Sequence, residues 1–312
     1  MVLLVNLARV VFAPLLGEFI LFFEVDRATV GIVATLVWLG SAALRVPTGW
    51  LLTRVPRHRV VLGTGVVLVV ASGVTASATT VETLMVGAVS MGLASGAYFV
   101  AANPLVSELF PDRVGRAMGI HGTASQLAAV GVAPFVTVVL AVGPDLVDRV
   151  PFVSAAWQLV FVCVGLAAAV VTLALFVTAR STDLPDAGAA DRDLLGAART
   201  EWRVILTGIV ILGFTGFVWQ GLFNFYELYM VSKGLPATTA RNMLTVIFGA
   251  GVPAFFLSGR LADRLPRIPY ILGVLVSFVV SVFVLTMTTT LVGLVVVTAV
   301  VGYVIPSLFP AL

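Results

Sequence analysis

The sequence predicts an all-helical protein that crosses a membrane many times, and three observations support this fold class. Of the 312 residues, 60% are hydrophobic and only 11% are charged, whereas soluble domains average about 45–50% and about 25%. The mean hydropathy is strongly positive, at +1.12. The apolar residues gather into runs of about 20, the length that a transmembrane helix needs. Lipid admits only helices or closed barrels, and the alternating pattern of a barrel is absent from the sequence.

Ten apolar runs give the order of the predicted helices. They cover about residues 2–23, 30–52, 59–78, 82–107, 117–141, 157–179, 203–226, 237–258, 269–288 and 291–312. The first run lacks the leading charges and the cleavage site of a signal peptide, so we expect it to be retained. Residues 180–200 are polar and predict a linker between an N-terminal six-helix bundle (1–179) and a C-terminal bundle (201–312). Six runs before the linker and four after it suggest that two helices are missing from the second half.

The composition also argues against several classes of function. The net charge of +3 is too small for a nucleic-acid footprint. A single cysteine, Cys163, permits no internal disulfide and suggests no metal cluster. The only lysine, Lys233, lies outside any phosphate-binding loop, so we expect no ATP site in this chain. We expect no enzyme activity, cofactor or metal; the expected partners are the lipid bilayer, a small-molecule substrate and a coupling proton.

Orientation follows from the loop arginines and lysines, because cytoplasmic loops are enriched in both. Alternate connections, starting between the second and third runs, hold twelve: Arg54, Arg57, Arg59, Arg113, Arg116, Arg180, Arg192, Arg199, Arg203, Arg260, Arg264 and Arg267. The opposite connections hold four: Arg27, Arg149, Lys233 and Arg241. We therefore expect a multi-pass protein of the plasma membrane whose N-terminus and linker are cytoplasmic.

An internal repeat relates the two halves. The nine residues from Gly49 to Arg57 align with those from Gly259 to Arg267, and five of the nine positions are identical. Both copies connect an even-numbered run to the next one on the predicted cytoplasmic side. Two related halves with a binding site between them are a common transporter construction.

These loops resemble the G-x-L-x-D-R-x-G-R-[RK] motif of the major facilitator superfamily, which follows the second and eighth spans. The resemblance assigns a gating role to the loop residues Gly49, Thr53, Arg54, Arg57, Gly259, Asp263, Arg264 and Arg267. Thr53 stands where the superfamily usually has Asp, so the first copy lacks the motif's acidic group. The resemblance implies a twelve-span bundle of two pseudo-symmetric halves, of which this chain covers spans 1 to 10.

A second match to the superfamily runs from span 4 into span 5. It includes Gly92 and Gly96, whose spacing permits a close approach of two helices. Phe110-Pro111 then ends one helix, and Gly115-Arg116 begins the next. The antiporter signature of span 5 is only partly present, since Gly122, Gly131 and Pro134 are found without a glycine before the proline.

Arg45 is the clearest candidate for a substrate contact. An ionisable group within a span is costly and is therefore a functional hypothesis by default. Its guanidinium could clamp an anion such as a carboxylate, or it could extend to the interface. Arg45 before Val46-Pro47 resembles the anion-binding arginine of the nitrate/nitrite porters. Their second arginine and their Gly-Asn signature are replaced here by Phe255 and Ala124-Ser125, which disfavours nitrate itself.

Other polar residues within the spans complete the candidate site. Glu18 could carry a coupling proton or reach water at the outer end, and Arg9 with Asn6 could be interfacial or line a cavity. In span 7, Gln220, Asn224 and Glu227 share one face, beside aromatic residues that could form a substrate wall or an interfacial belt. The predicted substrate-binding residues are Arg45, Glu18, Asn103, Gln126, Trp219, Gln220, Asn224 and Tyr303.

The leading functional prediction is therefore a secondary active transporter that moves a small organic or inorganic anion by alternating access. Proton-coupled efflux of apolar compounds is an alternative, because the candidate cavity residues are largely aromatic and apolar. A membrane sensor or scaffold that does not transport is an alternative of another class, and the missing acidic group at Thr53 favours it.

Overall fold

The computed structural model describes residues 1–312 except 183, 185–195, 197–198, 263–264 and 308–312. The described part of the chain is helical and contains no strand, as predicted. The helices of the N-terminal half are α1 (Val2–Val10), η1 (Ala13–Leu15), α2 (Leu16–Phe23), α3 (Arg27–Ala43), α4 (Arg45–Leu51), α5 (Arg57–Ala76), α6 (Val81–Leu109), η2 (Pro111–Arg113), α7 (Val114–Val142), η3 (Gly143–Asp145), η4 (Val147–Arg149) and α8 (Ala156–Arg180). Those of the C-terminal half are α10 (Trp202–Ser232), α11 (Ala237–Ala262), α12 (Arg267–Met287) and α13 (Leu291–Val304).

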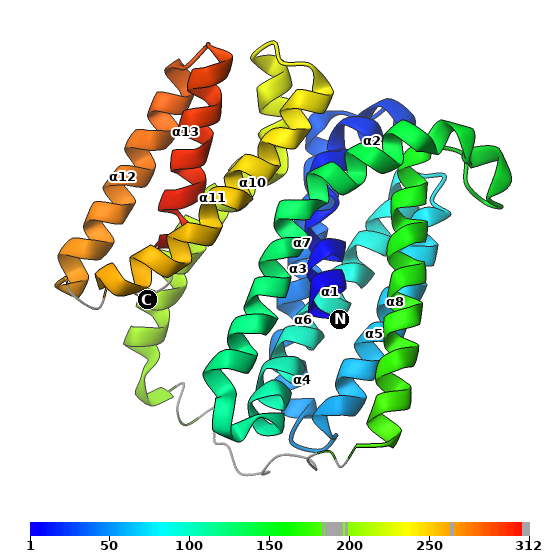
Figure 1. Ribbon diagram of the computed structural model, residues 1–312, viewed down its shortest axis with the longest axis vertical. Coiled ribbons are helices and arrows are strands. Elements are labelled where there is room, and N and C mark those ends of the chain that lie inside the picture. Colours follow the sequence, from blue (N-terminus) through cyan, green and yellow to red (C-terminus); the bar gives the residue numbers. More distant parts are fainter. Residues whose placement is uncertain (183, 185–195, 197–198, 263–264, 308–312) are drawn as a thin grey trace.

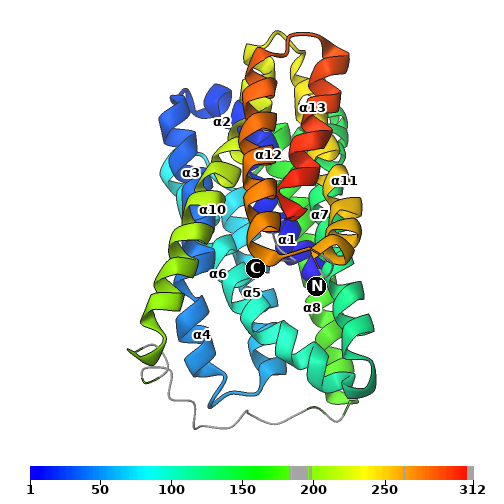
Figure 2. The ribbon, with the colours of Figure 1, turned by 90° about the vertical axis from the view of Figure 1, so that its left-hand side faces the viewer.

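The two halves lie side by side as separate groups of helices, with α10 to α13 on the left in Figure 1 and in front in Figure 2. The loops alternate between two ends of the bundle. We call one end the linker end, because it carries residues 52–56, 110–113 and the segment between α8 and α10. The opposite end, which we call the far end, carries residues 24–26, 77–80, 143–155, 233–236 and 288–290.

Many of the helices are long enough to cross a membrane. In the described chain, six are sufficiently long and apolar, and α1 together with the bent segment Ala13–Phe23 makes a seventh. The 14 residues of α13 form a shorter apolar helix. Each of the ten predicted runs contains helix at the expected place.

Two of the predicted runs are interrupted, which the apolar pattern did not indicate. The first bends by 42° between Val10 and Ala13, next to Pro14. The second breaks at Leu44, between α3 and α4, three residues before Pro47. A proline has no N–H for the carbonyl four residues earlier, and its ring crowds that carbonyl. The interruptions place Arg45 at the start of a new helix and Glu18 in a segment that leans away from α1.

Small residues bring α3 and α6 into close contact. A Cβ atom added at Gly92 would lie 2.1 Å from the carbonyl oxygen of Val37, and one at Gly96 would lie 2.2 Å from that of Ser41. Gly40 faces α6 equally closely, since its Cβ would lie 2.5 Å from the carbonyl oxygen of Val89. The predicted close approach at Gly92 and Gly96 is therefore confirmed, and α3 is its partner.

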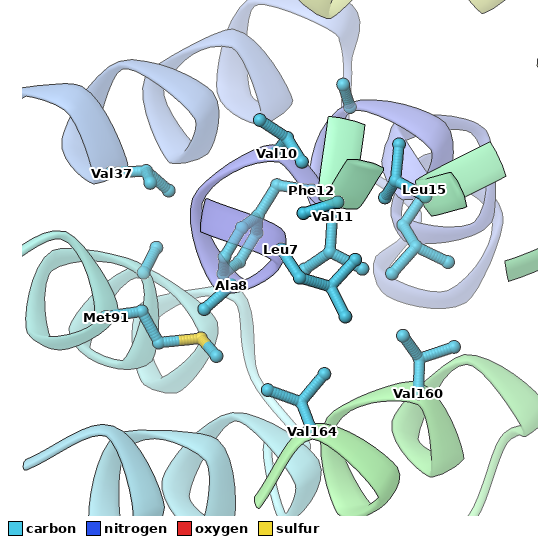
Figure 3. Packing of buried hydrophobic residues seen from close by; sticks show 14 of the residues in the cluster. Leu7, Ala8, Val10, Val11, Phe12, Leu15, Val37, Met91, Val160 and Val164 are labelled. Carbon is cyan, nitrogen blue, oxygen red and sulfur yellow. The ribbon is translucent and has the colours of Figure 1, made fainter. Parts of the chain in front are cut away.

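The core of the N-terminal half surrounds α1. In Figure 3, side chains from α1 and the turn after it lie between Val37 of α3, Met91 of α6, and Val160 and Val164 of α8. Each of these four contacts is at most 1% exposed. Burial on three sides fixes the position of α1, and with it the polar residues that α1 carries.

The repeat in the sequence corresponds to a repeat in the structure. Pro56 caps α5 with φ −55° and ψ 138°, and Pro266 caps α12 with φ −57° and ψ 130°. Both prolines begin a helix that starts at the linker end, where a proline costs no hydrogen bond. The two halves therefore share this local geometry as well as the motif.

A methyl group at Gly92 should separate α3 from α6. We expect Gly92→Ala to lower the melting temperature of the purified protein clearly, because overpacking costs about 1–3 kcal/mol and a backbone carbonyl cannot move aside. Gly73→Ala is the matched control, since a Cβ there meets nothing within 4 Å. Equal melting temperatures for the two variants would contradict the assigned contact.

Candidate functional site

A cavity of about 410 Å³ lies between the two halves. Its N-terminal wall is formed by α1, α3, α4 and α7, and the residues on it are Asn6, Arg9, Val10, Trp38, Arg45, Ser125, Gln126 and Ala129. Its C-terminal wall is formed by α10, α11 and the end of α13, and the residues on it are Gly216, Trp219, Gln220, Phe223, Ile247, Phe248, Gly251, Ile305 and Pro306.

Arg9 is held in place by its neighbours. One of its terminal nitrogens, Nη2, donates a hydrogen bond of 2.6 Å to Oδ1 of Asn6. The Asn6 amide in turn donates one of 2.7 Å to the backbone carbonyl of Ser125 in α7. The guanidinium carbon lies 4.5 Å from the ring centre of Trp38 and 5.1 Å from that of Phe99, within the range of cation–π attraction. The Nε of Arg9 is buried and has no hydrogen-bond partner.

Arg45 supplies a second positive charge to the same wall. It lies close enough to Arg9 for the two charges to repel each other. Its side chain is exposed to the cavity and forms no ion pair with any other residue that the structure describes. No acidic residue is among those lining the cavity, so the described wall carries two unopposed positive charges.

The C-terminal wall is mostly apolar. Phe248 contacts two aromatic rings, with ring centres 6.2 Å from Trp219 and 5.1 Å from Phe223, both edge-on. Gln220 is its main polar side chain, and its backbone carbonyl accepts a 2.8 Å hydrogen bond from Asn224. The cavity thus has a cationic wall and an aromatic wall facing each other.

A buried ion cluster joins the two halves at the far end. Arg241 of α11 places Nη2 3.1 Å from Oε1 of Glu18 and 3.1 Å from Oε1 of Glu227. Its Nε donates a 3.0 Å hydrogen bond to the carbonyl of Pro14, in the interruption of the first span. The side chains of Arg241 and Glu227 are only 6% and 3% exposed. The sequence analysis placed Arg241 in a loop; the structure corrects this, because Glu18 of the opposite half allows its charge to be buried.

The other hydrogen bonds between the halves, among the described residues, lie toward the same end. Thr137 of α7 donates a 3.3 Å bond to Oδ1 of Asn242, and Thr245 of α11 donates one of 3.3 Å to the carbonyl of Val130. The halves are therefore fastened to each other near the far end.

The predicted site residues divide into two groups. Arg45, Gln126, Trp219 and Gln220 line the cavity, and Asn224 lies directly beside it through its bond to Gln220. The remaining three lie elsewhere: Glu18 in the ion cluster, Asn103 within α6, and Tyr303 in a separate cavity beside α12. Arg9 and Asn6, which the sequence left between interface and cavity, line the cavity.

The first copy of the loop motif makes contacts only within the N-terminal half. Arg57 pairs with Glu108 of α6 at 3.0 Å, so α5 and α6 are linked at the linker end. Arg54 stacks on Trp50 at 4.3 Å, and the Thr53 hydroxyl donates to the carbonyl of Trp50 at 2.8 Å. Gly49 lies within α4. In the second copy, Gly259 belongs to α11 and Arg267 begins α12, while Asp263, Arg264 and the side chain of Arg267 lie outside the described residues.

The comparisons with known proteins identify the family. The sequence profile of the Major Facilitator Superfamily matches residues 1–312. The chain belongs to this superfamily. It is therefore a multi-pass membrane protein with the fold of the secondary transporters. No match to its sequence was found among curated proteins.

Several solved transporters share the fold. A bacterial homolog of the human lysosomal transporter Spinster, in an inward-facing and occupied conformation, aligns with a TM-score of 0.79 and 19% identity, over 99% of this chain and 70% of its own. A D-xylose–proton symporter aligns at 0.71 and 15% identity, over 98% and 77%. A variant of the nucleoside transporter NupG aligns at 0.71 and 13% identity, over 99% and 79%.

Removing the charge of Arg241 should open the far end. Arg241→Gln leaves two carboxylates facing each other without a cation, and breaking a buried pair costs about 3–5 kcal/mol. We expect longer distances between spin labels at Ala28 and Ser232, measured by electron–electron double resonance with Cys163 replaced by Ala. Arg149→Gln, an exposed arginine at the same end, is the control. An unchanged distance distribution in Arg241→Gln would show that the cluster does not hold the halves together.

Proposed function

We propose that this superfamily member transports a small anion, organic or inorganic, by alternating access. The observation that carries the proposal is the pair of guanidinium groups, Arg9 and Arg45, on a cavity wall without an acidic residue among its described members. Two buried or half-buried cations without a counter-ion are costly. An anion in the cavity would offset that cost, and an arginine fork is suited to bind one.

We also propose that the linker end faces the cytoplasm. The excess of arginines in the linker-end loops favours this orientation, and the burial of Arg241 removes one charge from the far-end count. With the far end fastened by the ion cluster, the structure then corresponds to an inward-facing state. The similarity to the inward-facing Spinster homolog supports this interpretation.

Proton coupling is the further part of the proposal. The cluster holds two carboxylates, Glu18 and Glu227, against one guanidinium, so a proton on one carboxylate would balance its charge. Opening the far end would part Glu18 from Arg241 while Glu227 and Arg241 stay together in one half. Glu18 is therefore the carboxylate whose environment changes most during transport, which suits a coupling role. One structural neighbour is a proton symporter.

Efflux of an apolar compound remains the second candidate, because Trp219, Phe223 and Phe248 form an apolar wall. Against it stands the cost of covering Arg9 and Arg45 with a neutral molecule, which would remove water from both cations without replacing it by an acceptor.

Counterflow in proteoliposomes would test the proposal. We expect exchange of a radiolabelled small anion such as acetate or nitrate, reduced about tenfold or more in Arg45→Ala, because hydrogen bonds to charged groups contribute about 1.5–3 kcal/mol. Arg180→Ala is the matched control, since Arg180 stacks on Phe176 at the end of α8, outside the cavity.

Two outcomes would contradict the proposal. Anion exchange that proceeds equally in Arg45→Ala would exclude Arg45 as the clamp. Exchange of lipophilic cations or neutral compounds, with none of anions, would favour the efflux function instead.

A further inference from the structure

The two walls of the cavity have different chemistry, and this difference bears on the kind of anion. Arg9 and Arg45 lie on the N-terminal wall, whereas the opposite wall presents Trp219, Phe223 and Phe248. A site for a small inorganic anion would be expected to surround it with donors on all sides. Here the donors occupy one side only, and the other side offers aromatic surface.

The hydrogen-bonding capacity left free on the cationic wall defines the head group. One terminal nitrogen of Arg9 is committed to Asn6, and Asn6 is itself anchored to α7. The Nε of Arg9 is buried without a partner, which is costly unless a ligand accepts from it. Arg45, beside it, is free of any ion pair with a described residue. One planar, bidentate acceptor such as a carboxylate would satisfy both groups.

The aromatic wall defines the rest of the ligand. Phe223 is only 2% exposed and supports Phe248 from behind, so the surface available to a ligand is held in place. Drug-sized ligands typically occupy pockets of about 300–1,000 Å³, and the cavity of about 410 Å³ lies within that range. It exceeds the needs of acetate or nitrate, and leaves room for an apolar body between the arginines and the aromatic rings.

We infer that the cavity binds amphipathic organic carboxylates, with the carboxylate on Arg9 and Arg45 and an aryl or alkyl body against Trp219 and Phe248. This inference rests on the proposed anion transport and narrows its substrate class. It excludes inorganic anions and fully hydrophilic acids as the preferred ligands.

A ligand series on the purified protein tests it. Dissociation constants for nitrate, acetate, phenylacetate and 3-phenylpropionate would be measured by calorimetry, with 3-phenylpropan-1-ol as the neutral analogue. Each buried methylene contributes about 0.8 kcal/mol, or about fourfold in affinity. We therefore expect 3-phenylpropionate to bind at least tenfold more tightly than acetate, and the alcohol to bind more weakly than the acid.

Two variants assign the two ends of the ligand. Arg45→Gln should weaken all the acids and leave the alcohol unchanged. Phe248→Ala should reduce the preference for 3-phenylpropionate over acetate to about threefold or less. Phe217→Ala is its matched control, because Phe217 lies on α10 but is 80% exposed at the outer surface. If Phe248→Ala does not fold, the ligand series on the unmodified protein still decides.

The outcomes separate this inference from the proposed function. If nitrate and acetate bind as tightly as 3-phenylpropionate, and all depend on Arg45, anion binding stands and the amphipathic class is wrong. If no acid binds in an Arg45-dependent manner, both fail. If the alcohol binds as tightly as the acid, the aromatic wall binds ligands without the arginines, and the inference is overturned.

Discussion

Arg241 places one guanidinium between a carboxylate of each half, and the position of the halves depends on this contact. A buried arginine is stable only while its partners are present, because desolvation of an unpaired charge costs more than packing returns. Glu227 belongs to the same half as Arg241, so it is a partner in any state, whereas Glu18 and the Pro14 carbonyl are partners only when the far end is closed. The cluster can therefore distinguish two conformations of the bundle.

Interrupted helices place the chemistry that the cavity and the cluster use. Pro14 lies where the first span bends, and its carbonyl is one of the acceptors of Arg241. Pro47 follows the break at Leu44, and Arg45 begins the helix that results. In lipid, irregular backbone is tolerated only where protein or a cavity covers it. The breaks and the polar groups consequently occur together.

The two halves share a repeated loop but divide the work of the cavity. The N-terminal half packs α3 tightly on α6 through Gly92 and Gly96 and buries α1 on three sides. This rigid frame holds two arginines whose charges repel each other. The C-terminal half contributes the aromatic wall instead. At the position equivalent to Arg45 it carries Phe255, so the symmetry of the fold does not extend to the ligand site.

The sequence by itself determined the membrane class, the helix order, the repeat and several cavity residues, because hydropathy, spacing and the cost of intramembrane charge are local properties. Arg45, Gln126, Trp219 and Gln220 could be proposed on those grounds. Asn103 and Tyr303 satisfied the same criteria but face elsewhere, because the rotation of each helix in the bundle decides which face meets the cavity. Only the tertiary structure paired Arg241 with Glu18, since the two residues are 223 positions apart and no periodicity relates them. A single span shows that a charge is costly; its partner becomes known only when the helices pack.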